Sequence, residues 1–168
     1  MRSALGFTLI ELLVVISITA ILSVIAFVNY KDFAQAQMLN KAVTEIQTYL
    51  RLAQSNSTAS VICTPQAGAW GINFAEGGTV NLVCGPNQQI KKTLSLQNIQ
   101  ISSIKGDLCP SSLNLPLLIS YSSLYGAVSF SGSADCLSQS LTITINLIDI
   151  KGNTKPLNIS KGGAINGQ

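Results

Sequence analysis

The chain begins with a long apolar run and later changes character. Residues 12–30 carry no charged side chain, and neither glycine nor proline occurs between residues 7 and 64. Such a run favours an uninterrupted helix. Together with residues 7–11 it is long enough, at about 1.5 Å per residue, to cross a hydrocarbon core of about 30 Å. The pattern therefore predicts a membrane-spanning helix near the N-terminus.

After Lys31 the apolar residues fall on one side of the predicted helix. They recur at steps of three and four residues between polar and charged side chains, as in an amphipathic helix. We expect one continuous helix over residues 7–55, with a transmembrane first half and an amphipathic second half that packs on a domain. The apolar side of the second half consists of Phe33, Ala36, Leu39, Ala42, Val43, Ile46, Leu50 and Ala53.

Beyond residue 55 the pattern changes to the period of β-strands. Alternating or β-branched runs cover residues 60–64, 71–75, 80–84, 99–104, 117–123, 126–130 and 141–149, and clusters of Gly, Pro, Asn and Ser separate them. This predicts an antiparallel β-rich head of about seven to nine short strands over residues 56–160. Residues 161–168 have little apolar surface and are expected to be a flexible tail. The fold class is α+β, with a long N-terminal helix packed on the head.

Composition argues against an enzyme. Charged residues make up 10% of the chain and histidine is absent, so a Ser-His or Cys-His nucleophile, or a His-ligated zinc site, would lack its key part. The acidic residues are scattered singly, and the chain has neither a GxxxxGK[ST] nor a GxGxxG motif to hold a phosphate. We expect no catalysis, no cofactor and no metal.

All the cysteines lie in the β region, at Cys63, Cys84, Cys109 and Cys136. An even number of cysteines after a membrane segment, without CxxC spacing, fits two disulfides in a head exported to an oxidising space. We favour Cys63–Cys84 with Cys109–Cys136, because neighbours in sequence are often neighbours in space. The other pairings stay open, as does a cytosolic domain with buried thiols.

Two features near the N-terminus are unusual for a simple anchor. Glu11 is an acid within an apolar helix, where a carboxylate costs at least about 2.5 kcal/mol unless something neutralises it. Gly6 precedes Phe7 after a short leader whose one positive side chain is Arg2. A secretory signal peptide would have a shorter apolar core that ends in small residues. The apolar segment is therefore predicted to stay in the mature protein.

The sequence GFTLIELLVV at residues 6–15 resembles the type III signal of type IV pilins and type II secretion pseudopilins. The resemblance implies a leader over residues 1–6, cleavage between Gly6 and Phe7 by a prepilin peptidase, N-methylation of Phe7 and a lollipop fold. It also implies that Glu11 neutralises the terminal ammonium of a neighbouring subunit during assembly. An ion pair within one helix, and a carboxyl kept protonated by burial, are the alternatives for Glu11.

Two further segments, LRLAQSNSTASVIC at residues 50–63 and AWGINF at residues 69–74, look like the GspH/FimT subgroup of minor pilins and pseudopilins. The resemblance implies a non-enzymatic filament subunit. Its partners would be prepilin peptidase, other pilin or pseudopilin subunits, the membrane assembly platform and the cell membrane. The protein would sit in the cytoplasmic (inner) membrane as a single-pass subunit, with its head in the periplasm or outside the cell. The alternatives are a DNA-uptake or adhesive module at a filament tip, and a plain anchor whose head works alone.

Other residues have simpler interpretations. Trp70 and Phe74 are expected in the core of the head, and Lys91 and Lys92 in a solvated turn. The glycine pairs at residues 77–78 and 162–163 indicate turns rather than phosphate loops. A mobile basic tail could engage a few DNA phosphates, but so few contacts would bind weakly and lose affinity with salt. The lysines of that tail are Lys151, Lys155 and Lys161.

Overall fold

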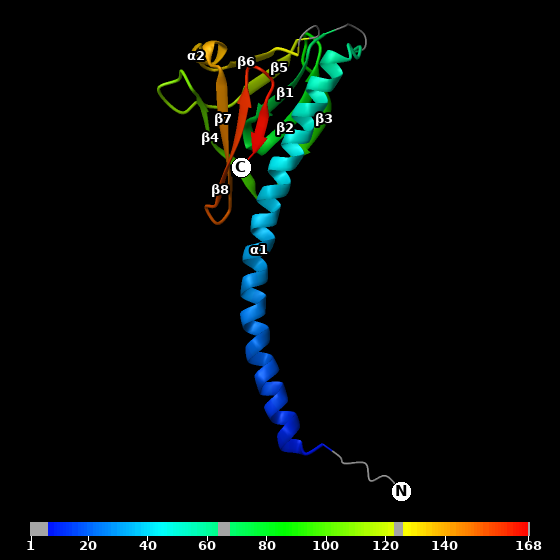
Figure 1. Ribbon diagram of the computed structural model, residues 1–168, viewed down its shortest axis with the longest axis vertical. Helices are drawn as coiled ribbons and strands as arrows, with labels where there is room; N and C mark the ends of the chain where they lie inside the picture. Colours follow the sequence, from blue (N-terminus) through cyan, green and yellow to red (C-terminus); the bar gives the residue numbers. More distant parts are fainter. Residues whose placement is uncertain (1–6, 64–67, 123–125, 168) are drawn as a thin grey trace. The chain divides into compact units, whose positions relative to one another are not determined.

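The computed structural model describes residues 7–63, 68–122 and 126–167, and of residues 25–29 and 32 it describes the backbone only (Figure 1). The chain divides into two compact units, Met1–Gln37 and Met38–Gln168. The long helix α1 (Leu9–Thr58) contributes to both of them. The predicted helix is therefore confirmed, with an end three residues later than expected.

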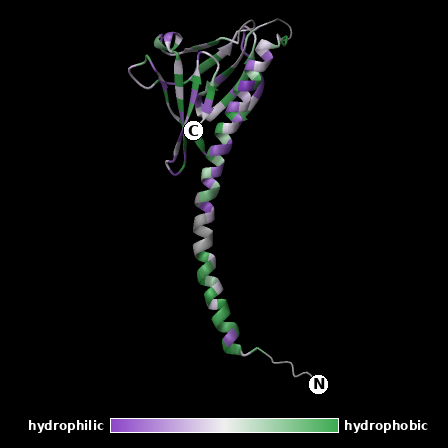
Figure 2. Ribbon diagram, viewed as in Figure 1, coloured by the Kyte–Doolittle hydropathy of each residue, from purple (hydrophilic) through white to green (hydrophobic). Residues whose placement is uncertain are grey.

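In the first unit α1 is mostly hydrophobic (Figure 2), and its described large apolar side chains are exposed. The hydroxyls of Ser17, Thr19 and Ser23 each donate to a backbone carbonyl one turn earlier, so they need no outside partner. No helix in the described part of the chain combines the length and the hydropathy needed to cross a membrane. The predicted crossing stays a prediction.

The second unit holds two antiparallel sheets. The first has the strand order β3-β2-β1-β5-β6 and the second β4-β7-β8-β9. A short 3-10 turn, η1 (Glu76–Gly78), links β1 to β2, and a short helix, α2 (Cys136–Gln139), precedes β7. The strands are β1 (Trp70–Ala75), β2 (Thr79–Cys84), β3 (Gln89–Ser95), β4 (Ile99–Gly106), β5 (Leu117–Tyr121), β6 (Val128–Gly132), β7 (Thr142–Asp149), β8 (Thr154–Ser160) and β9 (Ile165–Gly167).

The core lies where the second half of α1 meets the sheets. The dry side of the amphipathic pattern is buried from Leu39 onward, and Ile46, Leu50 and Ala53 are fully buried. Trp70 and Phe74 of β1 are buried in the same cluster, as predicted. The structure therefore confirms the α+β fold with an antiparallel head.

Two differences from expectation concern the strands. Residues 60–63 form no strand, because the Val61 carbonyl accepts the indole N–H of Trp70 and Cys63 is bridged to β2; Thr64 lies outside the described residues. Strand β8 is not among the predicted runs, and it contains Pro156. This proline lies beyond the part of β8 that β9 pairs with, where an open edge tolerates it.

The C-terminal residues differ most from expectation. Instead of a flexible tail, residues 161–163 form a turn and β9 pairs with β8. Ile165 is buried against the core. A Cβ at Gly167 would lie 2.5 Å from Val43 Cγ1, so the end of the chain packs closely on α1. One buried isoleucine and strand pairing order a segment that composition alone marks as polar.

Candidate assembly site

The start of α1 brings together the residues that the sequence singled out. Phe7 is 81% exposed and precedes the first turn of the helix. Glu11 lies in that first turn, among apolar side chains that are themselves exposed. Gly6, the predicted residue before the cleaved bond, lies outside the described residues. The described part of the site is therefore one carboxylate within an apolar surface.

Thr8 holds the Glu11 carboxylate. The Thr8 backbone N–H donates to Glu11 Oε2 at 3.1 Å and the Thr8 hydroxyl donates to the same oxygen at 2.9 Å. The Glu11 N–H in turn donates to Thr8 Oγ1 at 3.3 Å. This reciprocal arrangement is a capping box, which satisfies backbone donors that a helix start leaves free. In the single chain, Glu11 therefore caps its own helix.

Thr8 is a residue of the site that was not predicted from the sequence, although the signal was present. Thr8 and Glu11 have the T-x-x-E spacing of a capping box directly before an apolar run. The structure shows Thr8 as a local partner of Glu11. This partner differs from the two amines considered for the carboxylate, that of a neighbouring subunit and that of its own helix. One chain contains no neighbouring amine, so the pairing between subunits stays a prediction.

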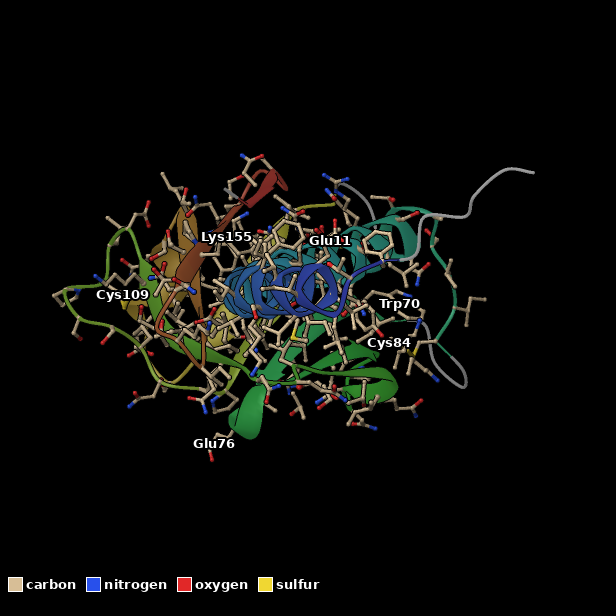
Figure 3. All side chains as sticks on the ribbon, turned by 90° about the horizontal axis from the view of Figure 1, so that it is seen from below. Glu11, Trp70, Glu76, Cys84, Cys109 and Lys155 are labelled. Atoms are coloured by element: carbon tan, nitrogen blue, oxygen red, sulfur yellow. A yellow bond between two sulfur atoms is a disulfide. The ribbon has the colours of Figure 1, made fainter. Side chains whose placement is uncertain are left out.

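The head contains two disulfides, Cys63–Cys84 and Cys109–Cys136, which is the pairing that the sequence favoured. Cys63 follows α1 and Cys84 ends β2, so both lie at the end of an element, and their Cα atoms are 5.9 Å apart. In Figure 3 Cys84 lies near Trp70, at the end of β2 that pairs with the start of β1. This bridge ties the end of α1 to the first sheet.

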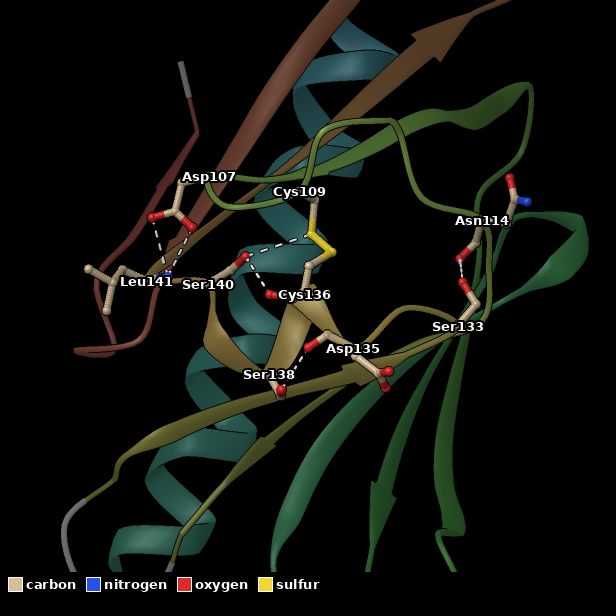
Figure 4. The surroundings of a disulfide bond; sticks show 9 residues. All are labelled: Asp107, Cys109, Asn114, Ser133, Asp135, Cys136, Ser138, Ser140 and Leu141. Atoms are coloured by element: carbon tan, nitrogen blue, oxygen red, sulfur yellow. Dashed lines mark hydrogen bonds between the residues drawn. A yellow bond between two sulfur atoms is a disulfide. The ribbon is translucent and has the colours of Figure 1, made fainter.

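The second bridge fixes the loop after β4 to α2 (Figure 4). The Ser140 hydroxyl lies 3.8 Å from Cys109 Sγ and donates to the Cys136 carbonyl at 3.0 Å. The Asp107 carboxylate accepts the Leu141 N–H at 3.0 Å. The polar groups around the bridge thus form hydrogen bonds with one another, and this part of the head has a structural role.

A buried hydrogen bond joins the end of α1 to β5. Ser57 is 1% exposed, and its hydroxyl donates to the Tyr121 carbonyl at 2.6 Å. The Tyr121 hydroxyl has no hydrogen-bond partner in the described part of the chain, and burial raises the pKa of that phenol. The hydrogen bond from Ser57 therefore connects the end of the helix to the sheet.

The lysines considered for nucleic acid do not form one tail. Lys91 and Lys92 lie in β3, not in a turn. Lys155 belongs to β8, and Lys161 donates from Nζ to the Ser138 carbonyl at 2.8 Å. The expectation of a mobile basic tail is wrong, because residues up to 167 belong to turns and strands. The described residues also contain no group of three or more Cys, Asp or Glu side chains placed to hold a metal.

Comparison with known proteins identifies the class of the N-terminal region. Residues 1–27 match the family described as the prokaryotic N-terminal methylation motif. Two fimbrial proteins of Pseudomonas aeruginosa are each 38% identical to this chain over 55 residues, which are 33% of this chain and 36% of each relative. The match thus covers about a third of the length of these relatives. No solved structure matches the chain.

The motif over residues 1–27 and the 55 residues shared with the fimbrial proteins are similarities of part of this chain. They agree with a fold in which an N-terminal helix precedes an antiparallel head.

Proposed function

We propose that this chain is a structural, non-enzymatic subunit of a type IV pilus-like or type II secretion filament, a minor subunit of the GspH/FimT type. The observation that carries the proposal is the methylation motif over residues 1–27. In the described part of this motif the large apolar side chains are exposed, and Glu11 lies among them near the start of α1. The subgroup is supported by the Trp-Gly pair at the start of β1, where Trp70 is buried and Gly71 follows it.

In this proposal a prepilin peptidase cleaves between Gly6 and Phe7, and the new amine of Phe7 is methylated. Cleavage creates an ammonium group at the start of an apolar helix, where an unpaired charge is expensive. Glu11 lies four residues on and carries the opposite charge. A bundle in which each amine meets a neighbour's carboxylate gains both stability and lengthwise register.

Thr8 adds a step to this mechanism. Before assembly its backbone and hydroxyl donors satisfy the Glu11 carboxylate, which lowers the cost of keeping the acid in an apolar environment. During assembly the amine of a neighbour replaces or joins these donors. The exchange is favourable because the ammonium group carries a full charge opposite to that of the carboxylate, and two such charges attract each other strongly in an apolar environment.

The remaining partners follow from the same proposal. The first part of α1 anchors the subunit in the inner membrane, and the assembly platform moves it into a fibre whose core consists of such helices. The head faces the periplasm or the cell exterior, which agrees with its two disulfides.

The test substitutes Glu11 by Val in cells that carry the rest of the machinery. We expect normal membrane insertion and a folded head, because loss of an acid eases insertion, but at least a tenfold lower amount in sheared filaments. Glu45→Gln is the matched control, because Glu45 is an acid of the same helix that pairs with Lys41 at 3.7 Å in the second unit. Normal incorporation of Glu11→Val would show that the carboxylate has no role in assembly.

A further inference from the structure

Strand β3 is an open edge of the first sheet. It is the terminal strand in the order of that sheet, and among the described strands it pairs with β2 alone. Its residues from Gln89 to Thr93 are all exposed. An open edge presents unpaired backbone groups to any extended segment that approaches it.

The hydrogen bond after β3 shows which groups face outward. The Leu96 N–H donates to the Gly78 carbonyl at 3.2 Å, so the backbone of Leu96 points toward β2. Groups of alternate residues point to the same side of a strand. Leu94 therefore also faces β2, and Thr93 and Ser95 direct their N–H and C=O groups to the open edge.

The same edge is positively charged. The register with β2 shifts between Leu82 and Val83, so that Lys91 is the extra residue of a bulge next to Lys92. Neither lysine forms an ion pair with a carboxylate in the described part of the chain. Lys91 Nζ contacts Gln89 Oε1 at 3.3 Å, and Lys92 Nζ lies 5.3 Å from the ring centroid of Tyr49 on α1.

An open hollow of about 320 Å³ continues this edge at its C-terminal end. Ser95 and Leu96 line one side of the hollow, and Met38, Lys41 and Glu45 of α1 line the other. Lys41 and Glu45 neutralise each other, so the unbalanced charge belongs to Lys91 and Lys92.

We propose that the β3 edge binds an extended acidic peptide segment of another protein by strand addition. Backbone groups of Thr93 and Ser95 pair with the peptide, and its carboxylates meet Lys91 and Lys92. A second copy of β3 is a poor occupant, because antiparallel pairing of two such edges would bring the lysines together, and like charges across a pair destabilise it. The lysines therefore select against self-pairing as well as for an acidic partner.

The test measures binding of a labelled peptide of alternating Glu and Val to the full chain in detergent micelles, by fluorescence anisotropy. Thr93→Pro removes the outward N–H but no ladder bond to β2. Thr93→Val keeps that N–H and loses only the side-chain bond to Asn81, so it is the matched control. We expect at least tenfold weaker binding for Thr93→Pro, less than threefold for Thr93→Val, and at least tenfold for Lys91→Gln combined with Lys92→Gln.

Two further ligands distinguish binding by strand addition from binding by charge attraction alone. A peptide of alternating Lys and Val is expected not to bind. A short DNA duplex is expected to bind more weakly than the acidic peptide, and its affinity for Thr93→Pro should equal its affinity for Thr93→Val. The proposal is overturned if both peptides bind alike, if the two Thr93 variants bind alike, or if the duplex is the tighter ligand. A near-ultraviolet circular dichroism spectrum like that of the wild type ensures that each variant is folded.

Discussion

Leu50→Ala tests whether the second half of α1 is part of the core of the head. Leu50 is fully buried, and it lies in the cluster that joins the helix to both sheets. The substitution removes three buried carbons, at about 0.8 kcal/mol each, and leaves a cavity that adds to this cost. Alanine favours a helix as well as leucine does, so helix propensity contributes no penalty. We expect the free energy of unfolding to fall by about 3 kcal/mol.

The helix provides its own control. Leu52 is 39% exposed on the other side of α1, so Leu52→Ala makes the same chemical change and should cost less than about 1 kcal/mol. For a domain of this size the midpoint of thermal unfolding falls by about 3 °C per kcal/mol. It should therefore fall by about 9 °C in Leu50→Ala and by less than about 3 °C in Leu52→Ala.

Trp70 is a suitable reporter for both variants, because it is the single tryptophan of the chain and is 7% exposed. Its fluorescence is recorded during thermal unfolding of the full chain in detergent. Equal losses for Leu50→Ala and Leu52→Ala would refute the placement of the helix in the core.

Three further predictions concern the head. Replacing Cys63 and Cys84 with alanine opens a loop with a sequence separation of 21. The free energy of unfolding, measured with urea, should fall by about 3.4 kcal/mol, and no loss would mean that the bridge is dispensable. Ser57→Ala leaves a buried carbonyl of β5 without its donor and should cost about 1 to 3 kcal/mol in the same assay; a loss below about 0.5 kcal/mol would contradict this. The Asn153 amide, with backbone donors of the same turn, lowers the pKa of Asp149. The stability this carboxylate provides is therefore present above its unfolded pKa of about 3.9 and is lost as the pH falls through its lower folded value. Asp149→Asn should flatten the decline of the unfolding midpoint below about pH 4, and an unchanged slope would exclude this role.

The periodicity of the sequence predicted much of the fold. The step of three to four residues from Leu39 to Ala53 matches the buried side of α1. The alternation in residues 141–149 matches β7, whose residues alternate between buried and partly exposed. Both patterns are reliable because each element buries one face in a single core.

Other elements depend on contacts that periodicity does not contain. Strand β3 is exposed on nearly every residue, so its side chains do not alternate, and it exists because β2 supplies a partner. Strand β9 depends on β8 and on the contact between Gly167 and Val43. At the candidate site, Glu11 could be predicted from its apolar surroundings, whereas the bond to Thr8 needed the capping-box spacing to be considered.

The intact mass of the protein recovered from sheared filaments of cells that have a prepilin peptidase tests most directly whether this chain is a processed filament subunit. We expect a chain that begins at Phe7, carries one additional methyl group on its amine and keeps both disulfides. A filament fraction whose chain still begins at Met1, or complete absence of the chain from filaments, would contradict it.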